Sequence, residues 1–377
     1  MTADFPTSEF EDRLERAQQA MSAARLDALL FTTEAEFRYF SGFRTRFWES
    51  PTRPWFLVVP RNGKPTAVIP EIGLEPMART WVEDIWKWPA PAATDDGVQL
   101  LTAALSGYAR IGMPMGRETS LRMPLKDFEA VRRGLPGAEF ADATHLVQTL
   151  RMAKSPAEIE KIAAICDVAN RAFAAAPDLF RADQPLSEAF RAFKIELLRQ
   201  GAEDVPYLVG GAGPDGYGDI ISPPTATPLR RGDVFMLDTG AQREGYFCDF
   251  DRNFAIGAAG EAARRAHARL HRATEAALAL ARPGVAASEL WRAMADVIDQ
   301  PGAGVGRYGH GLGMQLTEPP SLIDFDHTVL VPGMVLTLEP SMMAAPGRLL
   351  VHEENIVVRD GPPELLSART PPELPII

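Results

Sequence analysis

The chain has 377 residues, of which 46% are hydrophobic and 24% charged, which is typical of globular proteins with a large core. Its formal net charge of -11 excludes the basic footprint with which proteins bind nucleic acid or anionic membranes, so we expect neither partner. No apolar run approaches the roughly 20 residues that span a bilayer. The N-terminal sequence is too acidic for a signal peptide, and the only cysteines, Cys166 and Cys248, give no disulfide framework, which indicates a cytoplasmic location.

The first 150 residues alternate between predicted helices and strands. Apolar residues recur at helical spacing from about Ser8 to Ala24, and Leu26 to Phe31 is typical of a buried strand. An Asn-Gly pair at Asn62 and Gly63 predicts the turn of a β-hairpin between residues 55–60 and 65–69. Further helices are expected at 34–40, 96–109 and 124–133, and further strands at 110–113 and 138–141. This alternation predicts an α/β domain over residues 1–150.

A second domain is expected over residues 151–377. Ser155, Pro156 and Glu158 form the pattern of an N-cap, a first helical position and a capping box, which predicts a helix reaching about Ala175. From Val209 to Gly218 the chain becomes rich in glycine. Helices at 186–200, 261–281 and 288–299, with strands between and after them, predict an α+β domain whose sheet is mostly antiparallel.

The segment from Phe43 to Pro54, FRTRFWESPTRP, is too polar for a strand and too aromatic for a plain linker. It is therefore predicted to be a structured loop. One interpretation is that it packs against another domain or subunit. The other is that it forms a lid over an anionic substrate, because a guanidinium matches the geometry of a carboxylate. Its candidate substrate-binding residues are Arg44, Arg46, Trp48 and Arg53.

The segment GDVFMLDTGAQREGYFCDFDR, residues 232–252, contains two short β-rich runs, each of which ends in an acid. The runs predict a hairpin, with Asp238 and Asp249 facing each other across the ladder. Two carboxylates at such a short distance repel each other unless a cation lies between them, and oxygen ligands favour a divalent metal. The alternative is that both acids lie in exposed turns.

Three more residues fit a metal site. His310 lies among glycines in YGHGLG, where the backbone can pack closely, and Glu339 and Glu353 each follow an apolar run. With Asp238 and Asp249 they would form a dinuclear, oxygen-rich site that activates water and polarises a carbonyl. Two further histidines, at positions 267 and 271, have the i,i+4 spacing of metal ligands, but the arginines around them predict a solvated helix face.

The five candidate ligands lie in LDTGA, GYFCDFDR, GHGLG, TLEP and VHEEN. In order and in sequence these segments resemble the five ligand motifs of the pita-bread metallopeptidase family, which includes methionine aminopeptidase, aminopeptidase P, prolidase and creatinase. LRMAKSPAEIEKI also resembles the segment that opens the catalytic domain of two-domain members. The resemblance implies an α+β pita-bread catalytic domain over residues 151–377, preceded by a smaller α/β creatinase-type domain over residues 1–150.

The resemblance also implies roles for these residues around two divalent metal ions. Asp238 would chelate one ion, Asp249 and Glu353 would bridge both, and His310 and Glu339 would hold the other. Glu339 can also act as a proton shuttle, so that Glu339 and His310 are the candidate catalytic residues. We expect Mn, with Fe, Co or Zn as alternatives, because availability selects the metal of such sites as much as geometry does.

Two departures from the family pattern concern the substrate. Peptidase members carry a histidine before the Gly-Asp turn, where this chain has Ile221, and another after the GHG motif, where it has Thr317. Both histidines help to bind the peptide or to stabilise the transition state. Thr317 is therefore a candidate substrate-binding residue, and Asp251 adds an acid where the family usually has Thr.

The sequence thus predicts a dinuclear metal-dependent hydrolase that resembles Xaa-Pro aminopeptidase and prolidase. Its substrate would be a small amide or an Xaa-Pro-like peptide, attacked by a metal-bridging hydroxide. Because of the departures, the alternatives are a creatinase-like C–N hydrolase or a metal-dependent lyase resembling dimethylsulfoniopropionate lyase; a non-catalytic binding protein would not need all five ligands. By analogy with the family, a homodimer is expected.

Overall fold

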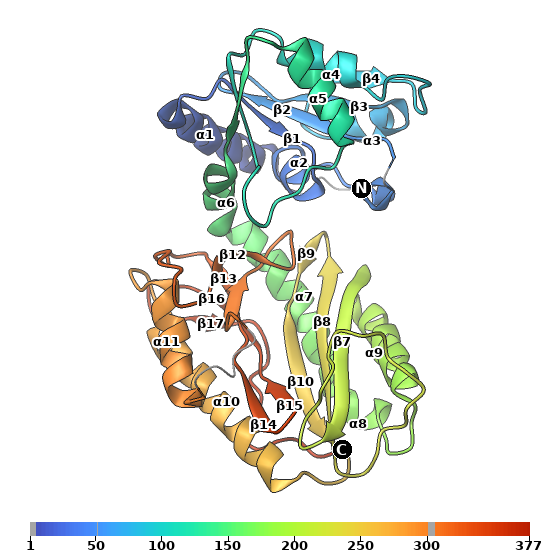
Figure 1. The fold of residues 1–377 in the computed structure, drawn as a ribbon, viewed down its shortest axis with the longest axis vertical. Coiled ribbons are helices and arrows are strands. Elements are labelled where there is room, and N and C mark those ends of the chain that lie inside the picture. Colours follow the sequence, from blue (N-terminus) through green and yellow to red (C-terminus); the bar gives the residue numbers. More distant parts are fainter. Residues whose placement is uncertain (1–4, 51, 301–305) are drawn as a thin grey trace. The chain divides into compact units, whose positions relative to one another are not determined.

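The structure is a computed structural model that describes residues 5–50, 52–300 and 306–377. The chain divides into two compact units, Met1–Arg151 and Met152–Ile377, which are considered separately (Figure 1). Within the described ranges, no helix is both long enough and apolar enough to cross a membrane.

The N-terminal unit is built on one six-stranded sheet with the strand order β4-β3-β2-β1-β5-β6. Its strands are β1 (Ala28–Phe31), β2 (Phe56–Pro60), β3 (Thr66–Pro70), β4 (Asp84–Trp88), β5 (Arg110–Met113) and β6 (Glu139–Asp142). Its α-helices are α1 (Thr7–Ala24), α2 (Glu34–Ser41), α3 (Leu74–Met77), α4 (Val98–Leu105), α5 (Leu125–Gly134) and α6 (Thr144–Met152), and short 3-10 turns cover Arg46–Glu49 and Glu71–Gly73.

The predicted hairpin of this unit is confirmed. β2 and β3 pair antiparallel, and Gly63 between them adopts a φ of 94°, which an L-residue rarely tolerates. The helix expected at residues 34–40 ends as predicted, because Gly42 caps α2 in the left-handed conformation. Strand β4 has no counterpart in the sequence prediction, since its burial is uneven and its Lys87 breaks the apolar pattern.

Over the described residues of the C-terminal unit, the named strands pair antiparallel, in agreement with the predicted mostly antiparallel sheet. Its helices are α7 (Pro156–Ala174), α8 (Ala176–Leu179), α9 (Leu186–Gln200), α10 (Glu261–Leu280) and α11 (Ala287–Ile298). Its strands are β7 (Asp204–Pro214), β8 (Asp233–Arg243), β9 (Tyr246–Phe247), β10 (Phe250–Ala255), β11 (Gly309–Gly311), β12 (Glu318–Ser321), β13 (Val335–Leu338), β14 (Ser341–Ala345), β15 (Arg348–Val351), β16 (Glu354–Val357) and β17 (Glu364–Leu365).

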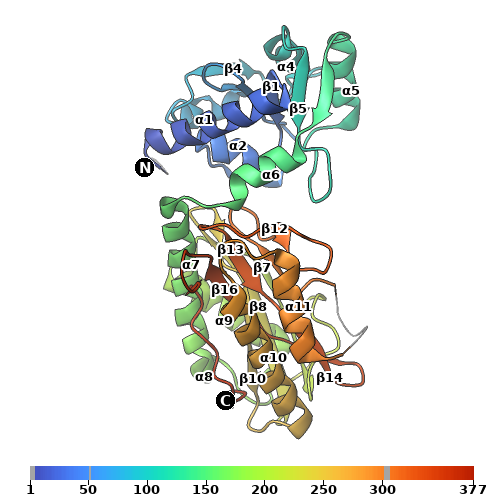
Figure 2. The same ribbon diagram turned by 90° about the vertical axis from the view of Figure 1, so that its left-hand side faces the viewer.

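These strands form two main sheets, β10-β8-β7 with β9 beside β8, and β12-β11-β13-β16-β17, together with the β14-β15 hairpin. Within this unit, α7 and α9 flank β8 and β7, whereas α10 packs on the β14-β15 hairpin and α11 packs on α10 (Figures 1 and 2). A buried apolar cluster joins the inner face of α10 to both sets of strands, from Val234 in β8 to Leu336 in β13. The two main sheets therefore share one core, and residues from both can meet at a single site.

The segment that opens this unit folds as its sequence predicts. Ser155 caps α7 by accepting a hydrogen bond from the backbone N–H of Glu158, and the Glu158 side chain accepts one from the N–H of Ser155. The Tyr246 hydroxyl donates a hydrogen bond to Glu158 at 3.0 Å. The capping box thus fixes both the start of α7 and its contact with β9.

The glycine-rich stretch that starts at Val209 lies partly in a strand that the sequence did not predict, because residues 204–214 form the long strand β7. Glycine is required here by close packing: a Cβ at Gly210, whose φ is 153°, would lie 2.1 Å from the carbonyl oxygen of Met236 on β8. A sequence rich in glycine therefore marks a close approach of backbones rather than a turn.

The predicted pairing of the two acids is also wrong in register. Asp238 lies within β8, and its partner across the ladder is Asp251 of β10. Asp249 lies between β9 and β10, at the point where the chain leaves one short strand and enters the next. A break in the strand therefore brings Asp249 into the site, and the ladder itself adds a further acid beside Asp238.

The histidine pair of α10 is only partly solvated. His271 is half-buried, but His267 is buried, and its Nε2 lies 3.1 Å from the carbonyl oxygen of Pro371. The prediction of a solvated face is therefore wrong for His267. It follows Ala263 by one helical turn and so lies beside the apolar stripe of α10, while Arg264 and Arg265 point to solvent.

Candidate metal centre

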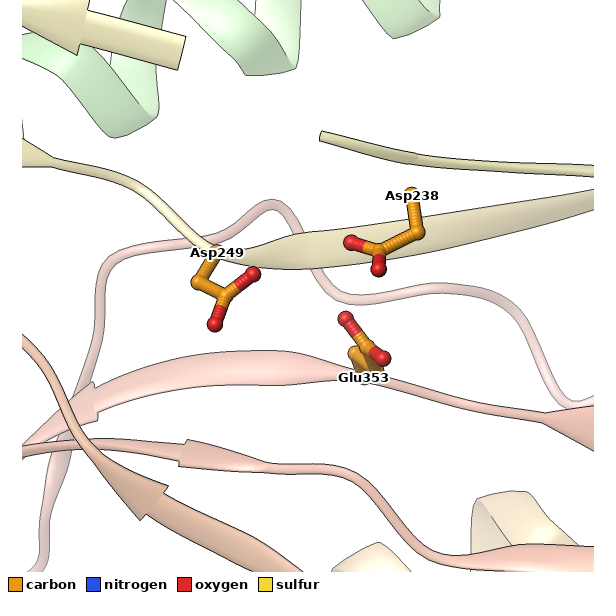
Figure 3. A group of neighbouring side chains, drawn as sticks. All are labelled: Asp238, Asp249 and Glu353. Atoms are coloured by element: carbon orange, nitrogen blue, oxygen red, sulfur yellow. The ribbon is translucent and has the colours of Figure 1, made fainter. Parts of the chain in front are cut away.

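Three carboxylates meet in the interior of the C-terminal unit (Figure 3). Asp238 comes from β8, Asp249 from the break between β9 and β10, and Glu353 from the link between β15 and β16. One oxygen of each lies within 4.8 Å of the others, and all three side chains are buried. Residues that lie far apart in the sequence are therefore held at the spacing of ligands around a cation.

His310 and Glu339 adjoin this triad on the side of Asp249. The Nε2 atom of His310 lies 3.2 Å from Oδ2 of Asp249 and 3.6 Å from Oε2 of Glu339. Its Nδ1 lies 2.9 Å from the carbonyl oxygen of Gly311, and only a protonated Nδ1 can donate to that oxygen. The Nε2 lone pair is thus directed at the acids, as a metal-ligating histidine requires.

Glycine lets the His310 strand approach its neighbour. Gly309 has a φ of 145°, and a Cβ there would lie 2.3 Å from the carbonyl oxygen of Thr337 on β13. Because β11 pairs with β13 over these residues, His310 lies beside the strand that delivers Glu339. The glycines of YGHGLG therefore set the distance between the imidazole and the fourth acid.

Asp249 is positioned through its backbone. The Asn355 side chain accepts a hydrogen bond from the N–H of Asp249 at 2.9 Å and donates one to its carbonyl oxygen at 2.5 Å. The Thr337 hydroxyl donates to the same carbonyl oxygen at 2.9 Å. Asn355 and Thr337 face each other on β16 and β13, so the second sheet holds the strand break of the first.

The two adjacent glutamates of VHEEN have different environments. Glu353 belongs to the acidic triad, whereas Glu354 is fully buried between Arg252, at 3.1 Å, and Arg369, at 3.0 Å. Arg252 also donates to the carbonyl oxygen of Glu353 at 2.9 Å. Successive residues of an extended chain point to opposite sides, which assigns Glu354 to the structure and leaves Glu353 for the metal.

Burial and mutual repulsion raise the pKa of these acids. Burial, with the Asp249 charge added, raises the pKa of Asp238 to about 8. Burial raises the pKa of Glu339 to about 7, and the pKa values of Asp249 and Glu353 lie well above their usual range, chiefly through burial. Like charges in a low-dielectric interior favour either protons or a cation between them.

The donor atoms fit a divalent metal. Oδ1 of Asp238 and Oε2 of Glu353 are buried without a hydrogen-bond partner in the protein. Unsatisfied buried carboxylate oxygens are costly unless a cation or water completes them. Five side chains, four acids and one imidazole, thus converge on a site whose chemistry suits Mn, Fe, Co or Zn.

Sequence reasoning missed Tyr207 at this site. It lies on β7 and donates a hydrogen bond to Asp238, and burial together with the Asp238 charge raises the pKa of its hydroxyl far above the usual range. Asp251, noted from the sequence only as an extra acid, is fully buried and accepts a hydrogen bond from Asn253 at 2.6 Å. Tyr207 lies in β7, a strand that the sequence did not predict, and it belongs to no motif that would have placed it here.

The positions where peptidases carry histidines are occupied differently. The Ile221 side chain is 80% exposed, in the chain between β7 and β8. Thr317 lies directly before β12, and its hydroxyl accepts a hydrogen bond from Arg307 at 3.4 Å. Arg307 is a second residue that sequence reasoning did not single out.

The predicted lid residues lie in the N-terminal unit. Trp48 is buried against Phe37, with ring centroids 5.3 Å apart, so core packing accounts for it. Arg44 and Arg46 are exposed, and the half-buried Arg53 lies over the Phe47 ring. The substrate role of these arginines stays a prediction.

A third residue missed by sequence reasoning organises this loop. Arg122 donates hydrogen bonds to the carbonyl oxygens of Phe47 at 2.9 Å and Trp48 at 3.1 Å, and also to that of Ser50. Its guanidinium thus replaces the backbone partners that a strand or helix would supply. The described residues of this loop, 43–50 and 52–54, are therefore structured, as the sequence predicts.

We expect the metal-free protein to lose stability as the pH rises. The native acids hold protons up to about pH 7 for Glu339 and about pH 8 for Asp238, whereas in the unfolded chain they release them near pH 4. Where the native state binds more protons, the free energy of unfolding falls with rising pH. Denaturant unfolding of chelator-treated protein between about pH 5.5 and about pH 8 measures this slope.

Saturation with Mn²⁺ is the control for this pH dependence. Metal ions displace the shared protons, so binding should release protons and the loss of stability towards about pH 8 should disappear. A metal-free protein whose stability is flat or rises across that window would show that the acids are not protonated in the native state.

Comparisons with known proteins agree with this geometry. Residues 160–360 match the family model described as Metallopeptidase family M24, and residues 13–153 match the Creatinase/Prolidase N-terminal domain. The chain is 28% identical over 363 residues to a probable dipeptidase PepE of Mycobacterium tuberculosis, covering 94% of this chain and 93% of that protein. It is 26% identical over 360 residues to an Xaa-Pro dipeptidase of Pyrococcus horikoshii, covering 93% and 95%.

Solved structures show the same fold. The dipeptidase PepE from Mycobacterium ulcerans superposes with a TM-score of 0.85 at 28% identity, covering 99% of both chains. The prolidase from Pyrococcus horikoshii superposes with a TM-score of 0.82 at 22% identity and supports the fold alone. The acidic triad lies within the matched catalytic region, and the relatives are hydrolases of peptides. This protein is therefore an enzyme of metallopeptidase family M24, with a creatinase-type N-terminal domain and a pita-bread catalytic domain.

Proposed function

We propose that this protein is a cytoplasmic, dinuclear metal-dependent dipeptidase, acting on short peptides or similar small amides. The observation that carries the proposal is the buried group of Asp238, Asp249 and Glu353, with unsatisfied oxygens on the first and the last. His310 and Glu339 beside it complete a ligand set for two divalent ions, of which Mn²⁺ is our first choice.

Bound ions would polarise the scissile carbonyl and lower the pKa of a water molecule, which supplies a nucleophile near neutral pH. We assign Asp249 and Glu353 to both ions, Asp238 to one, and His310 and Glu339 to the other. Tyr207 would orient Asp238 through its hydrogen bond, and Asn355 would fix Asp249 through its backbone.

Glu339 is the candidate proton shuttle. Its side chain is 21% exposed, whereas Asp249 and His310 are 6% and 4% exposed, so Glu339 lies on the accessible side of the group. A general base must reach both the proton that it removes and the leaving group that it protonates. Glu339 can do so while its other oxygen remains close to His310.

The second candidate function is chemistry on a non-peptide substrate, as a C–N hydrolase or a lyase. The observation that favours it is the absence of histidine at positions 221 and 317, since both peptidase imidazoles act on the peptide itself. The metal group alone does not distinguish the two functions, because polarising a carbonyl and activating water serve several reactions.

A substrate screen with metal-loaded protein separates these functions. It compares Xaa-Pro dipeptides, other dipeptides, non-peptide amides, and sulfonium or betaine compounds. Our proposal expects hydrolysis of dipeptides without proline above every other class. Turnover confined to the sulfonium or betaine compounds would replace it with the second function.

The loop arginines give a separate expectation, in which a homodimer brings residues 43–54 to a substrate. Arg46 is exposed, and its 3.4 Å ion pair with Glu49 is exposed too, so Arg46→Ala should change the free energy of unfolding by less than about 1 kcal/mol. If Arg46 binds a substrate carboxylate, this variant should raise KM severalfold. Steady-state kinetics on the best substrate of the screen, with Arg44→Ala and Arg53→Ala in parallel, provide the measurement. Unchanged KM and kcat in all three variants would remove the loop from the site.

A further inference from the structure

A groove lies on the surface of the C-terminal unit, between α10 and β14, two elements that pack side by side (Figures 1 and 2). Its volume is about 340 Å³, which falls at the lower end of the range for small-molecule pockets. None of the five candidate metal ligands lines it. It is therefore a second concave site, and the proposed hydrolysis does not use it.

Three arginines of α10 line one side of this groove. Arg265, Arg269 and Arg272 follow one another at spacings of four and three residues, which places them along one stripe of the helix. Like charges at these spacings destabilise a helix slightly. The groove is thus a local basic patch on a chain whose formal net charge is -11, and a bound anion would relieve the repulsion within it.

The guanidiniums of this stripe are available to a ligand. Arg272 is exposed and, among the residues that the structure describes, forms no hydrogen bond or ion pair. Arg269 is half-buried and donates a hydrogen bond to the carbonyl oxygen of Ile298 at 3.2 Å, which orients it while leaving its other N–H groups unused. Arg265 pairs with Glu261, but both side chains are exposed, and surface pairs of this kind contribute little. An anion would therefore meet three guanidiniums without breaking a buried contact.

The β14 side of the groove is apolar and already fixed. Met342 and Met343 line it, and the small side chain of Ala262 on α10 leaves the space between them open. The Gln300 side chain donates to the carbonyl oxygen of Met343 and accepts from its N–H, both at 3.0 Å. Because these backbone groups are satisfied, a peptide cannot add to β14 as a further strand at this point. An apolar group could instead pack on the adaptable methionine side chains.

Charge and size together select the class of ligand. Anionic membranes are bound by clusters of about four to eight basic residues, and nucleic acids by a basic protein face, and three arginines on an acidic chain provide neither. A phosphate monoester carries close to two negative charges and three acceptor oxygens, so it matches several guanidinium forks better than a carboxylate does. The volume of the groove suits a small molecule.

We propose that this groove is a binding site for a small organic phosphate. Arg265, Arg269 and Arg272 would hold the phosphate group, and an apolar or aromatic body would pack against Met342 and Met343. The site is separate from the metal centre, and its occupation does not depend on the proposed dipeptidase function.

Isothermal titration of the metal-loaded full chain with adenosine monophosphate (AMP), adenosine and inorganic phosphate tests this site. Wild type should bind AMP with a Kd below about 1 mM, and at least about tenfold more tightly than either adenosine or phosphate. Arg272→Gln and Arg269→Gln should each weaken AMP about tenfold, because each removes a charge-assisted hydrogen bond. Ala262→Leu should weaken it as well, since it fills the groove with a residue that favours helix.

Arg264→Gln is the matched control, because Arg264 is exposed on α10, does not line the groove and carries the same charge. It should leave the affinity for AMP unchanged. Metal content and dipeptide hydrolysis should stay at wild-type values in all four variants, since none of these residues belongs to the metal centre. AMP held by the metal ions would inhibit hydrolysis and would bind equally in every variant.

Several results would overturn the proposal. They are a wild type that binds no AMP, an affinity for AMP that survives Arg272→Gln and Ala262→Leu, and adenosine or phosphate binding as tightly as AMP. An equal loss in Arg264→Gln would also overturn it, because net charge alone would then explain the binding. Arg272 has no partner to lose, so Arg272→Gln keeps the test decisive even if Arg269→Gln lowers the free energy of unfolding. Loss of AMP binding confined to the groove variants supports the site.

Discussion

Replacing Asp249 with alanine should abolish both metal binding and hydrolysis. Its oxygen lies within 4.8 Å of Asp238 and Glu353, and His310 is 3.2 Å away, so Asp249 joins the triad to the second pair of ligands. If Asp249 holds both ions, as we propose, its loss removes a ligand from each of them. Elemental analysis of purified protein should find less than half of the wild-type metal, and dipeptide hydrolysis should fall below detection.

The same variant should not destabilise the metal-free protein. Removing one of several buried like charges relieves repulsion and the desolvation that raises the pKa of Asp249. Asp249→Asn tests the charge alone with the shape kept, and Asp324→Ala, which removes an exposed acid, is the matched control. Full metal occupancy in both Asp249 variants would show that this residue is not a bridging ligand.

Xaa-Pro dipeptides should be poor substrates. Loss of a single transition-state donor typically costs about 10²–10³ in rate, and this chain lacks both peptidase histidines. Neither Ile221 nor Thr317 carries an imidazole. The Ile221 side chain is 80% exposed, and the Thr317 hydroxyl is hydrogen-bonded to Arg307. We therefore expect kcat for Xaa-Pro dipeptides to lie at least about a hundredfold below that of the Pyrococcus horikoshii Xaa-Pro dipeptidase under matched metal loading.

Dipeptides without proline are the internal control for that comparison. They should be hydrolysed better than their Xaa-Pro counterparts by this protein, while the order is reversed for the archaeal enzyme. Equal turnover of Xaa-Pro dipeptides by the two proteins would mean that other side chains replace the missing histidines. Tyr207 and Arg307 would then be the first residues to mutate.

The sequence predicts the parts of this fold that depend on local rules. The capping box at Ser155 fixes the start of α7, and the Asn62-Gly63 turn fixes the β2-β3 hairpin, because each involves neighbours in sequence. The five acid and histidine motifs predict a common site because each ends or interrupts a β-like run. Family membership follows from the order of those motifs, which the matched family model confirms.

Features that depend on contacts between distant strands could not be predicted. Strand β7 was not predicted, because its glycines are required by the close approach of the β8 backbone, which the local sequence does not reveal. The ladder partner of Asp238 is Asp251, because the register in which β9 pairs with β8 continues unchanged into β10. His267 is buried because α10 packs on the apolar core, and the arginines around it in sequence had indicated a solvated face instead.

The residues missed at the site share a physical reason. Tyr207 and Arg307 carry no motif, and each reaches the metal centre only through tertiary packing, by a hydrogen bond to Asp238 and an ion pair with Glu339. Arg122 organises the loop of residues 43–54 from a position about 70 residues away in sequence. Single polar residues that act across a fold leave no periodic signal for sequence reasoning to detect.

Metal reconstitution tests the central claim most directly. Chelator-treated protein is titrated with Mn²⁺ while bound metal per chain and hydrolysis of a dipeptide without proline are measured on the same samples. We predict no activity without metal, activity that rises with bound metal, and saturation at two ions per chain. Dipeptide hydrolysis that is equal in the metal-free and the metal-loaded protein, or a protein that binds no metal, would contradict the account.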